Sequence, residues 1–204
     1  MTCAITPVYL LNHSGEVKEA ELSAEISIKH LEDWHLRWRP FMIEKLKEIP
    51  PEKHPQHQHW NWLKKHQALD GQLSMRSYAV TSDNETQGMM WVRTTGFSQI
   101  PGANGKPIVY IEYIESAPWN VCTLQNPVKY RGIGRILLGA AIELSQKEEF
   151  KGRIGLHALS QAEPFYHGCG FSDLGVDHNY HNLRYYEMTE QQARQFLTPG
   201  ETNV

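Results

Sequence analysis

The stretch NPVKYRGIGRILLGAAIELSQ, residues 126–146, decides the fold prediction, because it joins a basic, glycine-containing turn to a long apolar run. Apolar residues recur at helical spacing from Ile133 onward, which predicts a helix from there to about Gln146. Gly132 and Gly134 lie where this helix begins, and glycine inside a helix costs about 1 kcal/mol relative to alanine. The sequence therefore indicates a structural or functional requirement for residues without side chains at this helix start.

A glycine-containing helix start is typical of an anion-binding site. The unpaired N–H groups of the first turn point outward, and the helix dipole adds roughly half a positive charge. Lys129, Arg131 and Arg135 place basic side chains around the same turn. The pattern is neither a Walker A loop nor the three-glycine dinucleotide fingerprint. It therefore indicates either another kind of phosphate site or a tight turn whose basic side chains are merely solvated.

The composition indicates a globular chain of one domain. The chain has 204 residues, of which 40% are hydrophobic and 21% are charged, a balance typical of a folded protein. A net charge of -3 gives no general attraction to nucleic acid or to anionic membranes. We therefore expect no nucleic-acid partner and no membrane partner.

Cysteine usage and the opening sequence predict a cytoplasmic location. Cys3, Cys122 and Cys169 are too few and too scattered for a disulfide framework, and no pair has metal-ligand spacing. The opening MTCAITPVYLLNHSGE lacks the basic segment of a signal peptide. No run approaches the roughly 18 apolar residues that span a bilayer. A soluble cytoplasmic protein without a bound metal is expected.

The order of the predicted elements favours an α/β fold of the α+β type with a mixed sheet. Residues 1–70 read as mainly helical, with Pro40 expected to end one helix and to open another that reaches about Ile49. A further helix is predicted over 57–69. Strand-like runs follow at 74–81, 88–95, 108–116, 153–159 and 182–189. Strands, then a strand–helix–strand unit, then another strand indicate strands of both directions.

The strand predicted over 108–116 carries the acidic candidates for chemistry. Its alternation places Glu115 on one face and Glu112 on the other, and both faces are otherwise largely apolar. Such a strand is expected to be central and buried. Ala117-Pro118 interrupts it, as a bulge or a strand end would.

Two linked motifs resemble those of the GNAT superfamily of N-acetyltransferases. The run 129–138 resembles its acetyl-CoA signature, Arg/Gln-x-x-Gly-x-Gly/Ala followed by an amphipathic helix, with Lys129 in place of Arg or Gln. Downstream, SQAEPFYHGCGF resembles the second motif through Ala162, Tyr166 and the Gly170-Phe171 pair. An asparagine that often precedes that alanine is replaced by leucine. The resemblance covers roughly residues 88–175.

The resemblance implies a GNAT-like, splayed mixed sheet flanked by helices, in a single domain over 1–204. Residues 1–70 would be the acceptor side and 71–190 the sheet and coenzyme-binding core. The pantetheine arm of acetyl-CoA would enter between the strands at 108–116 and 153–159, and the pyrophosphate would sit on the backbone amides of 131–135. The implied coenzyme-binding residues are Lys129, Tyr130, Arg131, Gly132, Ile133, Gly134, Arg135 and Ser160.

Acetyl transfer requires an amine without its proton and a leaving thiolate that gains one. The resemblance implies that Tyr166 is the general acid. Glu115 and Glu112 are the candidates for the general base, because burial would raise the pKa of either carboxyl. They point to opposite faces, so at most one faces the acceptor, and we favour Glu115. His157 is an alternative base.

Other reactive side chains are weaker candidates. Cys122 has no base near it in sequence, so we do not expect an acyl-enzyme. His54, His57 and His59 invite a metal interpretation, but the spacing of His57 and His59 points them apart on a helix and no acidic residue completes the set. We expect a solvated loop there. Trp119 and the adjacent Asn120 could line the acceptor pocket, and core packing is the alternative for Trp119.

The sequence therefore predicts an acetyl-CoA-dependent N-acetyltransferase that acetylates a primary amine of a small molecule in a ternary complex. A protein or peptide acceptor is one alternative, and a non-catalytic module that binds or senses acyl-CoA is another. The acyl donor could be longer than acetyl, and a homodimer is a family-level expectation.

Overall fold

The structure is a computed structural model that describes residues 5–198. Within these residues nine strands form one mixed sheet in the order β6-β1-β2-β3-β4-β5-β7-β9-β8. The strands are β1 Ile5–Asn12, β2 Val17–Ser23, β3 Met75–Ser82, β4 Glu85–Phe97, β5 Pro107–Ser116, β6 Tyr130–Arg131, β7 Ile154–Ala158, β8 Ser172–Asp177 and β9 Leu183–Met188. β5 and β7 pair in parallel, whereas β1–β2 and β7–β9 are antiparallel. The predicted mixed sheet flanked by helices is confirmed.

The chain separates into two compact units, which we describe one at a time. The first unit comprises the residues up to Trp91 together with Tyr113–Leu137, and the second comprises Val92–Glu112 together with the residues from Leu138 onward. Strands β4 and β5 and helix α4 (Ile133–Lys147) contribute residues to both units. A single domain over 1–204 stays a prediction.

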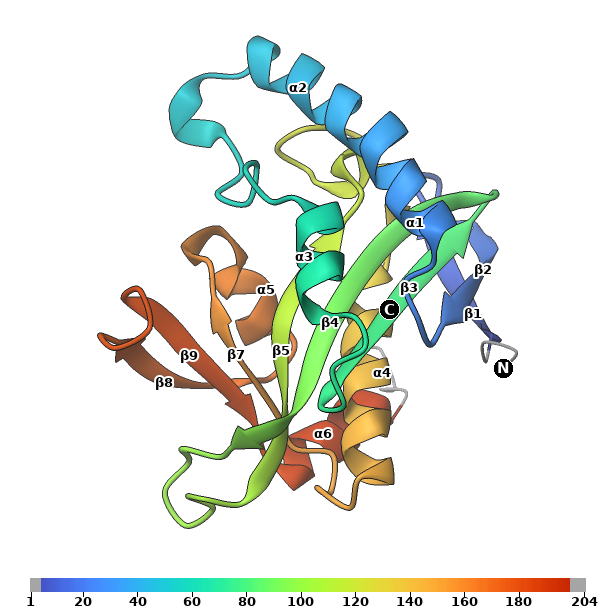
Figure 1. Cartoon of the computed structure of the whole chain (residues 1–204). Helices are drawn as coiled ribbons and strands as arrows, with labels where there is room; N and C mark the ends of the chain where they lie inside the picture. Colours follow the sequence, from blue (N-terminus) through green and yellow to red (C-terminus); the bar gives the residue numbers. More distant parts are fainter. Residues whose placement is uncertain (1–4, 199–204) are drawn as a thin grey trace. The chain divides into compact units, whose positions relative to one another are not determined.

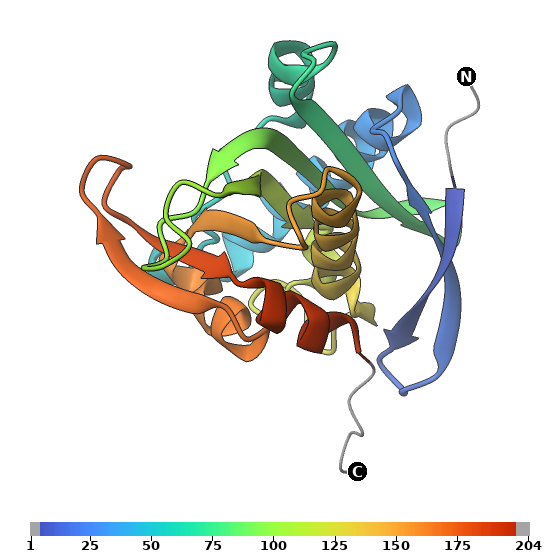
Figure 2. The ribbon, with the colours of Figure 1, turned by 90° about the horizontal axis from the view of Figure 1, so that it is seen from below.

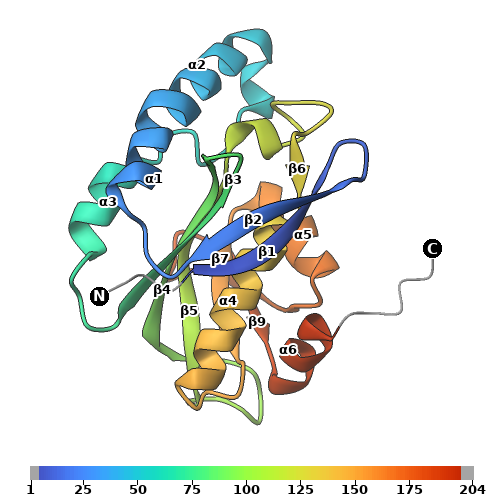
Figure 3. The ribbon, with the colours of Figure 1, turned by 90° about the vertical axis from the view of Figure 1, so that its right-hand side faces the viewer.

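The first unit begins with a β-hairpin that the sequence did not predict. Strands β1 and β2 pair along their length, from Ile5 opposite Ser23 to Leu11 opposite Val17 (Figure 3). Most of their side chains are exposed, so the hairpin has little of the apolar alternation from which strands are recognised. The prediction that residues 1–70 are mainly helical is therefore wrong for the hairpin, and helices occupy this region only from Ile28 onward.

The helical part of the first unit passes through Pro40 without a break (Figure 1). Helix α1 (Ile28–Asp33) continues as a π-helical turn, Trp34–Trp38, and then as α2 (Arg39–Glu48). The N–H of Arg39 bonds to the carbonyl of Trp34, five residues back. Pro40 lies in the first turn of α2, where a missing N–H is tolerated. The predicted break at Pro40 is therefore wrong, because the wider turn precedes the proline.

Helix α3 (Trp62–Leu69) completes the first unit and starts later than the predicted 57–69, since the Asn61 side chain caps it. Its Trp62 is fully buried, whereas the next residue, Leu63, is exposed. The core of the unit is made of the following residues: Ile26, Leu31, Trp34, Trp38, Trp62, Met75, Ala79, Met89, Trp91 and Ala117.

The second unit holds β7, β8 and β9 with two short helices, α5 (Glu163–Gly168) and α6 (Glu190–Leu197). Helix α6 follows β9 directly (Figure 2). The side chains of Thr189 and Gln192 cap its start. β7 pairs with β9 over its whole length, but its register with β5 covers only Ile154–Leu156. β5 and β7 are therefore paired over only part of their length, which agrees with the predicted splay of the sheet. In the described part of the chain no helix is long and apolar enough to cross a membrane.

Candidate active site

The predicted pyrophosphate turn lies between β6 and α4 in the first unit. β6 pairs with the end of β1, and Ile133 is the first residue of α4. Gly132 between them has φ +101°, a backbone conformation that side chains with a Cβ rarely adopt, and Gly134 lies in the first helical turn. The requirement for glycine at position 132 therefore comes from the backbone angle.

The side chains around this turn differ in how far they are buried and in what they contact. Lys129 Nζ lies 2.6 Å from a carboxylate oxygen of Glu85, and the Tyr130 hydroxyl donates to the Asp83 carboxylate. Arg131 and Arg135 are exposed. We infer that Lys129 and Tyr130 hold the turn in place, so that any coenzyme contact by them would come from the backbone. The roles assigned to residues 129–135 stay predictions.

Asn120 anchors the same turn, and the sequence had suggested it only as a residue that lines the acceptor pocket. Its Oδ1 accepts a hydrogen bond from the N–H of Tyr130 at 2.9 Å, and its Nδ2 donates to Gln87 at 2.9 Å. Gln87 Oε1 also accepts from the indole N–H of Trp119. Gln87 is fully buried. These contacts tie the segment after β5 to the start of the turn.

Gly132→Ala tests whether the turn binds a coenzyme. The left-handed conformation costs an alanine about 1–2 kcal/mol, so the variant turn relaxes in the free protein and binding must restore its shape. We expect coenzyme A to bind roughly tenfold more weakly, measured by isothermal titration. Gly102→Ala is the control, because Gly102 also has positive φ (83°) and open space around it but is remote in sequence from the turn. Equal affinity in the two variants would contradict the assignment.

Glu115, on β5 in the first unit, is a buried carboxyl with a perturbed pKa. It is 7% exposed, and the indole N–H of Trp62 donates to it. Burial raises the pKa of Glu115 to about 8, although the Trp62 hydrogen bond and the charge of Lys65 act in the opposite direction. A carboxylate with a pKa near the working pH is well suited to accept a proton during a reaction.

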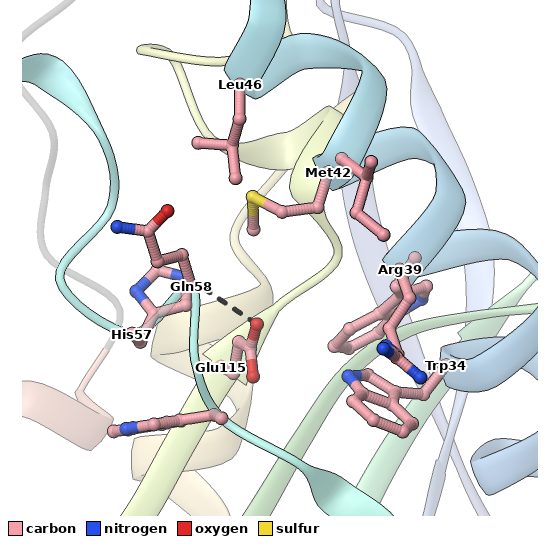
Figure 4. A pocket seen from close by; sticks show the side chains of 10 residues that line it. Trp34, Arg39, Met42, Leu46, His57, Gln58 and Glu115 are labelled. Atoms are coloured by element: carbon pink, nitrogen blue, oxygen red, sulfur yellow. Dashed lines mark ion pairs between the residues drawn. The ribbon is translucent and has the colours of Figure 1, made fainter. Parts of the chain in front are cut away.

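His57 faces Glu115, and the sequence analysis had placed it in a solvated loop. Its Nε2 lies 3.5 Å from Glu115 Oε1, the approach that Figure 4 marks with a dashed line, and its side chain is only 19% exposed. The solvated-loop prediction is therefore wrong for this histidine. Burial lowers the pKa of His57 to about 4, and His59 adds a smaller effect in the same direction. The imidazole is therefore neutral at pH 7 and above, so it does not compensate the charge that Glu115 gains as the pH rises through about 8.

Glu115 lies in the wall of a pocket with a volume of about 90 Å³. The other walls come from the π-helical turn, from α2 and from the loop before α3 (Figure 4). The lining residues are Trp34, Trp38, Arg39, Met42, Ile43, Leu46, His57, Gln58, Trp60 and Glu115. Beside it, Lys65 Nζ lies 3.0 Å from the centre of the Tyr113 ring and 4.4 Å from that of Trp60. The pocket therefore combines aromatic walls with one buried carboxyl group.

Glu112, the second candidate base, belongs to the second unit and is ion-paired. Its Oε1 lies 3.0 Å from Arg93 Nε, and the Arg93 guanidinium covers the Tyr110 ring at 4.4 Å. The ion pair with Arg93 occupies the carboxylate of Glu112, so this group is less available to contact an acceptor amine. The structure therefore favours Glu115 over Glu112, and both roles stay predictions.

Tyr166, the predicted general acid, lies in α5 of the second unit. It is 5% exposed and packs against the rings of Phe165, Phe171 and Tyr186. Burial raises the pKa of its hydroxyl well above the ordinary value, and Cys169 contributes in the same direction. The phenol therefore keeps its proton at neutral pH, which a general acid requires.

Other predicted site residues of the second unit have defined surroundings. Ser160 is exposed and opens a 3-10 turn; the N-cap of α5 is Ala162, which makes no side-chain cap. His157, the alternative base, is bonded to the Tyr110 hydroxyl at 2.7 Å and to Asp177 at 3.1 Å. Burial lowers the pKa of His157 despite Asp177. His157 is thus part of a buried chain of hydrogen bonds.

The cysteines and histidines of the described residues form no further candidate centre. Cys122 is exposed, Cys169 is buried, and Cys3 lies outside the described residues. Within residues 5–198 no cluster of three or more His, Cys, Asp or Glu side chains could hold a metal ion.

By sequence, the chain matches no family model and no curated protein. By structure it is similar to FeeM, an N-acyl amino acid synthase from uncultured soil microbes, with a TM-score of 0.53 at 11% identity over 96% of this chain and 95% of FeeM. It is also similar to spermidine N-acetyltransferase from Vibrio cholerae in complex with CoA and spermine, with a TM-score of 0.52 at 15% identity over 86% of this chain and 98% of that one.

A third similar structure is an acetyltransferase from Streptococcus agalactiae, with a TM-score of 0.50 at 14% identity over 82% of this chain and 96% of that one. The fold is that of the GNAT superfamily of acetyltransferases. The resemblance predicted from residues 129–138 and 162–171 is thereby confirmed at the level of the fold.

Proposed function

We propose that this protein is an acetyl-CoA-dependent N-acetyltransferase that acetylates a primary amine of a small molecule by direct transfer. The observation that carries the proposal is the pocket around Glu115, whose carboxyl is 7% exposed and has a pKa raised by burial to about 8. Such a group can accept a proton from an ammonium, which must be deprotonated before it can attack a thioester. The GNAT fold supplies the expectation of a coenzyme A thioester as the donor.

In the proposed reaction Glu115 takes a proton from the acceptor ammonium, and the amine nitrogen attacks the thioester carbonyl. A C–N bond forms, the C–S bond breaks, and the thiolate of coenzyme A leaves. We propose that Tyr166 gives its proton to this thiolate, since its raised pKa keeps it protonated until then. The second proton that the nitrogen loses as the amide forms restores the Tyr166 phenol, and Glu115 releases its proton to solvent. The backbone amides of 131–135 and the exposed Arg131 and Arg135 are proposed to bind the pyrophosphate.

The size of the pocket supports a small-molecule acceptor over a protein or peptide. The pocket has a volume of about 90 Å³, and the indoles of Trp34, Trp38 and Trp60 form part of its walls, whereas a peptide requires an extended groove. A non-catalytic module needs no proton acceptor, so the raised pKa of Glu115 favours an enzyme over this alternative. A longer acyl donor stays an alternative, since the similar FeeM is an N-acyl amino acid synthase. Cytoplasmic location and a homodimer remain expectations.

The proposal is tested by following thiol release from acetyl-CoA with the full chain and a panel of amines, with hydrolysis in the absence of amine subtracted. We expect turnover with at least one small primary amine and none with N,N-dialkylated analogues, whose tertiary nitrogen cannot form a neutral amide. Acetylation of peptides alone would favour the protein-acceptor alternative. Tight coenzyme A binding without turnover on any acceptor would favour the sensing module.

A further inference from the structure

The lining of the Glu115 pocket also discriminates among amines. We propose that the acceptor is a short aliphatic monoamine, whose ammonium group meets Glu115 and whose alkyl chain lies along the helical wall formed by Trp38, Met42 and Leu46. This inference rests on the proposed function and names the substrate class of the same pocket.

The charges of the lining fit a single ammonium group. Glu115 is the one carboxyl group among the lining residues, and Arg39 is the one fixed cation, its guanidinium 5.5 Å over the Trp34 ring. Figure 4 shows Arg39 directed toward Trp34 rather than toward Glu115. A second ammonium on a polyamine would therefore find no carboxylate in the lining and would meet the charge of Arg39. The carboxylate of an α-amino acid would lie close to that of Glu115, and like charges repel.

The walls are apolar where the rest of the acceptor would lie. Trp34, Trp38 and Met42 are 3%, 1% and 8% exposed, and the Trp38 indole is fixed by a 3.0 Å hydrogen bond to the carbonyl of Thr86. An alkyl group that moves from water to these apolar walls makes binding more favourable. Each methylene that becomes buried favours binding by about fourfold. A hydrophilic acceptor of the same size would gain nothing from this wall.

The volume of the pocket sets the size of the group that enters it. The pocket measures about 90 Å³. An apolar protein cavity that takes up benzene measures roughly 150 Å³. The pocket is thus smaller than that cavity and partly open to solvent, and we expect an unbranched alkyl chain to follow its wall more closely than a flat ring. This separates alkylamines from arylalkylamines of similar hydrophobicity.

The experiment compares n-butylamine with ethylamine, phenethylamine, spermidine and glycine on the full chain. Binding of each amine is followed by the intrinsic fluorescence of the pocket tryptophans without acetyl-CoA, and turnover is followed by thiol release with it. We expect n-butylamine to bind more tightly than ethylamine by about fourfold per buried methylene. The kcat/KM for n-butylamine should exceed the kcat/KM for phenethylamine, spermidine or glycine by about tenfold or more. Equal or better use of spermidine, glycine or phenethylamine would overturn the inference.

The two readouts separate this inference from the proposed function. One outcome is that n-butylamine binds with the expected selectivity but no amine is acetylated. This would contradict the proposed function and leave the amine-binding site assigned. Acetylation of spermidine by a protein that neither binds nor acetylates n-butylamine would sink the inference and leave the N-acetyltransferase proposal standing.

A variant pair tests the wall itself. Leu46→Ala enlarges the pocket at a half-buried position of α2. The ratio of kcat/KM for phenethylamine to kcat/KM for n-butylamine should therefore rise by about tenfold. Leu36→Ala is the matched control, because Leu36 lies in the adjoining π-helical turn with 67% of its surface exposed and does not line the pocket. The control should keep the wild-type ratio. The same shift in both variants would show that helix loosening, not the pocket wall, sets the selectivity.

Discussion

Glu115→Gln is expected to lower kcat for amine acetylation by about 10²–10⁴-fold, because the amide cannot take the proton of the acceptor. The pH profile gives the sharper result. The reactive pair is the Glu115 carboxylate with the ammonium form of the amine, so wild-type kcat/KM should rise as pH increases through about 8, the pKa of Glu115. It should fall again above the pKa of the free amine, about 10.4 for an alkylamine. The variant should lose the rise near pH 8.

The stability of the same variant shows whether it has folded. The pKa of Glu115 is raised in the folded protein, so the wild type loses stability as pH rises from the unfolded value near 4.5 through about 8. Glu115→Gln lacks this loss and should unfold at a higher temperature than the wild type at pH 9. Glu112→Gln is the matched control, since Glu112 is paired with Arg93, and it should keep the rise near pH 8. A rise that disappears only in Glu112→Gln would assign the base to Glu112.

Tyr166→Phe is expected to slow thiol release by about 10²-fold at saturating amine, because the departing thiolate no longer receives a proton. The hydroxyl is the only group removed, and the ring contacts with Phe165, Phe171 and Tyr186 can persist. Coenzyme A affinity, measured by isothermal titration, should stay within a factor of about two. The measurement is thiol release under single-turnover conditions, which isolates the chemical step from product release.

Tyr186→Phe provides the control for a buried tyrosine in the same unit. Its hydroxyl is bonded to His167 at 3.0 Å, so its loss should cost about 1 kcal/mol of stability without slowing thiol release. An equal loss of rate in both variants would attribute the effect of Tyr166→Phe to packing of the aromatic cluster. An unchanged rate in Tyr166→Phe would remove Tyr166 from the mechanism.

Much of the fold was predictable because its central strands and α4 have strong periodicity. The predicted strands at 74–81 and 108–116 match β3 and β5 within one residue at each end, and the helix predicted to begin at Ile133 does so. The β1–β2 hairpin was missed because its side chains are mostly exposed. The uninterrupted helix at Pro40 was missed because a π-turn depends on tertiary packing rather than on a local sequence signal.

The candidate site was only partly predictable, because local motifs and tertiary contacts carry different information. The glycine-containing helix start and Tyr166 were recognised from short patterns. The choice of Glu115 over Glu112 depends on the burial of one carboxyl and on the Arg93 partner of the other, which alternation along a strand does not reveal. His57 belongs to a loop far from Glu115 in sequence, and its histidine-rich neighbourhood resembled a solvated segment. No local pattern could have brought these two residues together.

The central claim is that the acetyl group passes directly from coenzyme A to an amine. The most direct measurement is single-turnover mass spectrometry of the protein mixed with acetyl-CoA, before and after addition of n-butylamine. We expect an unmodified protein throughout, with N-acetylated amine and free coenzyme A appearing together only after the amine is added. A protein that gains one acetyl group before the amine is added and loses it to the amine afterwards would contradict direct transfer, and the exposed Cys122 would be the first residue to examine.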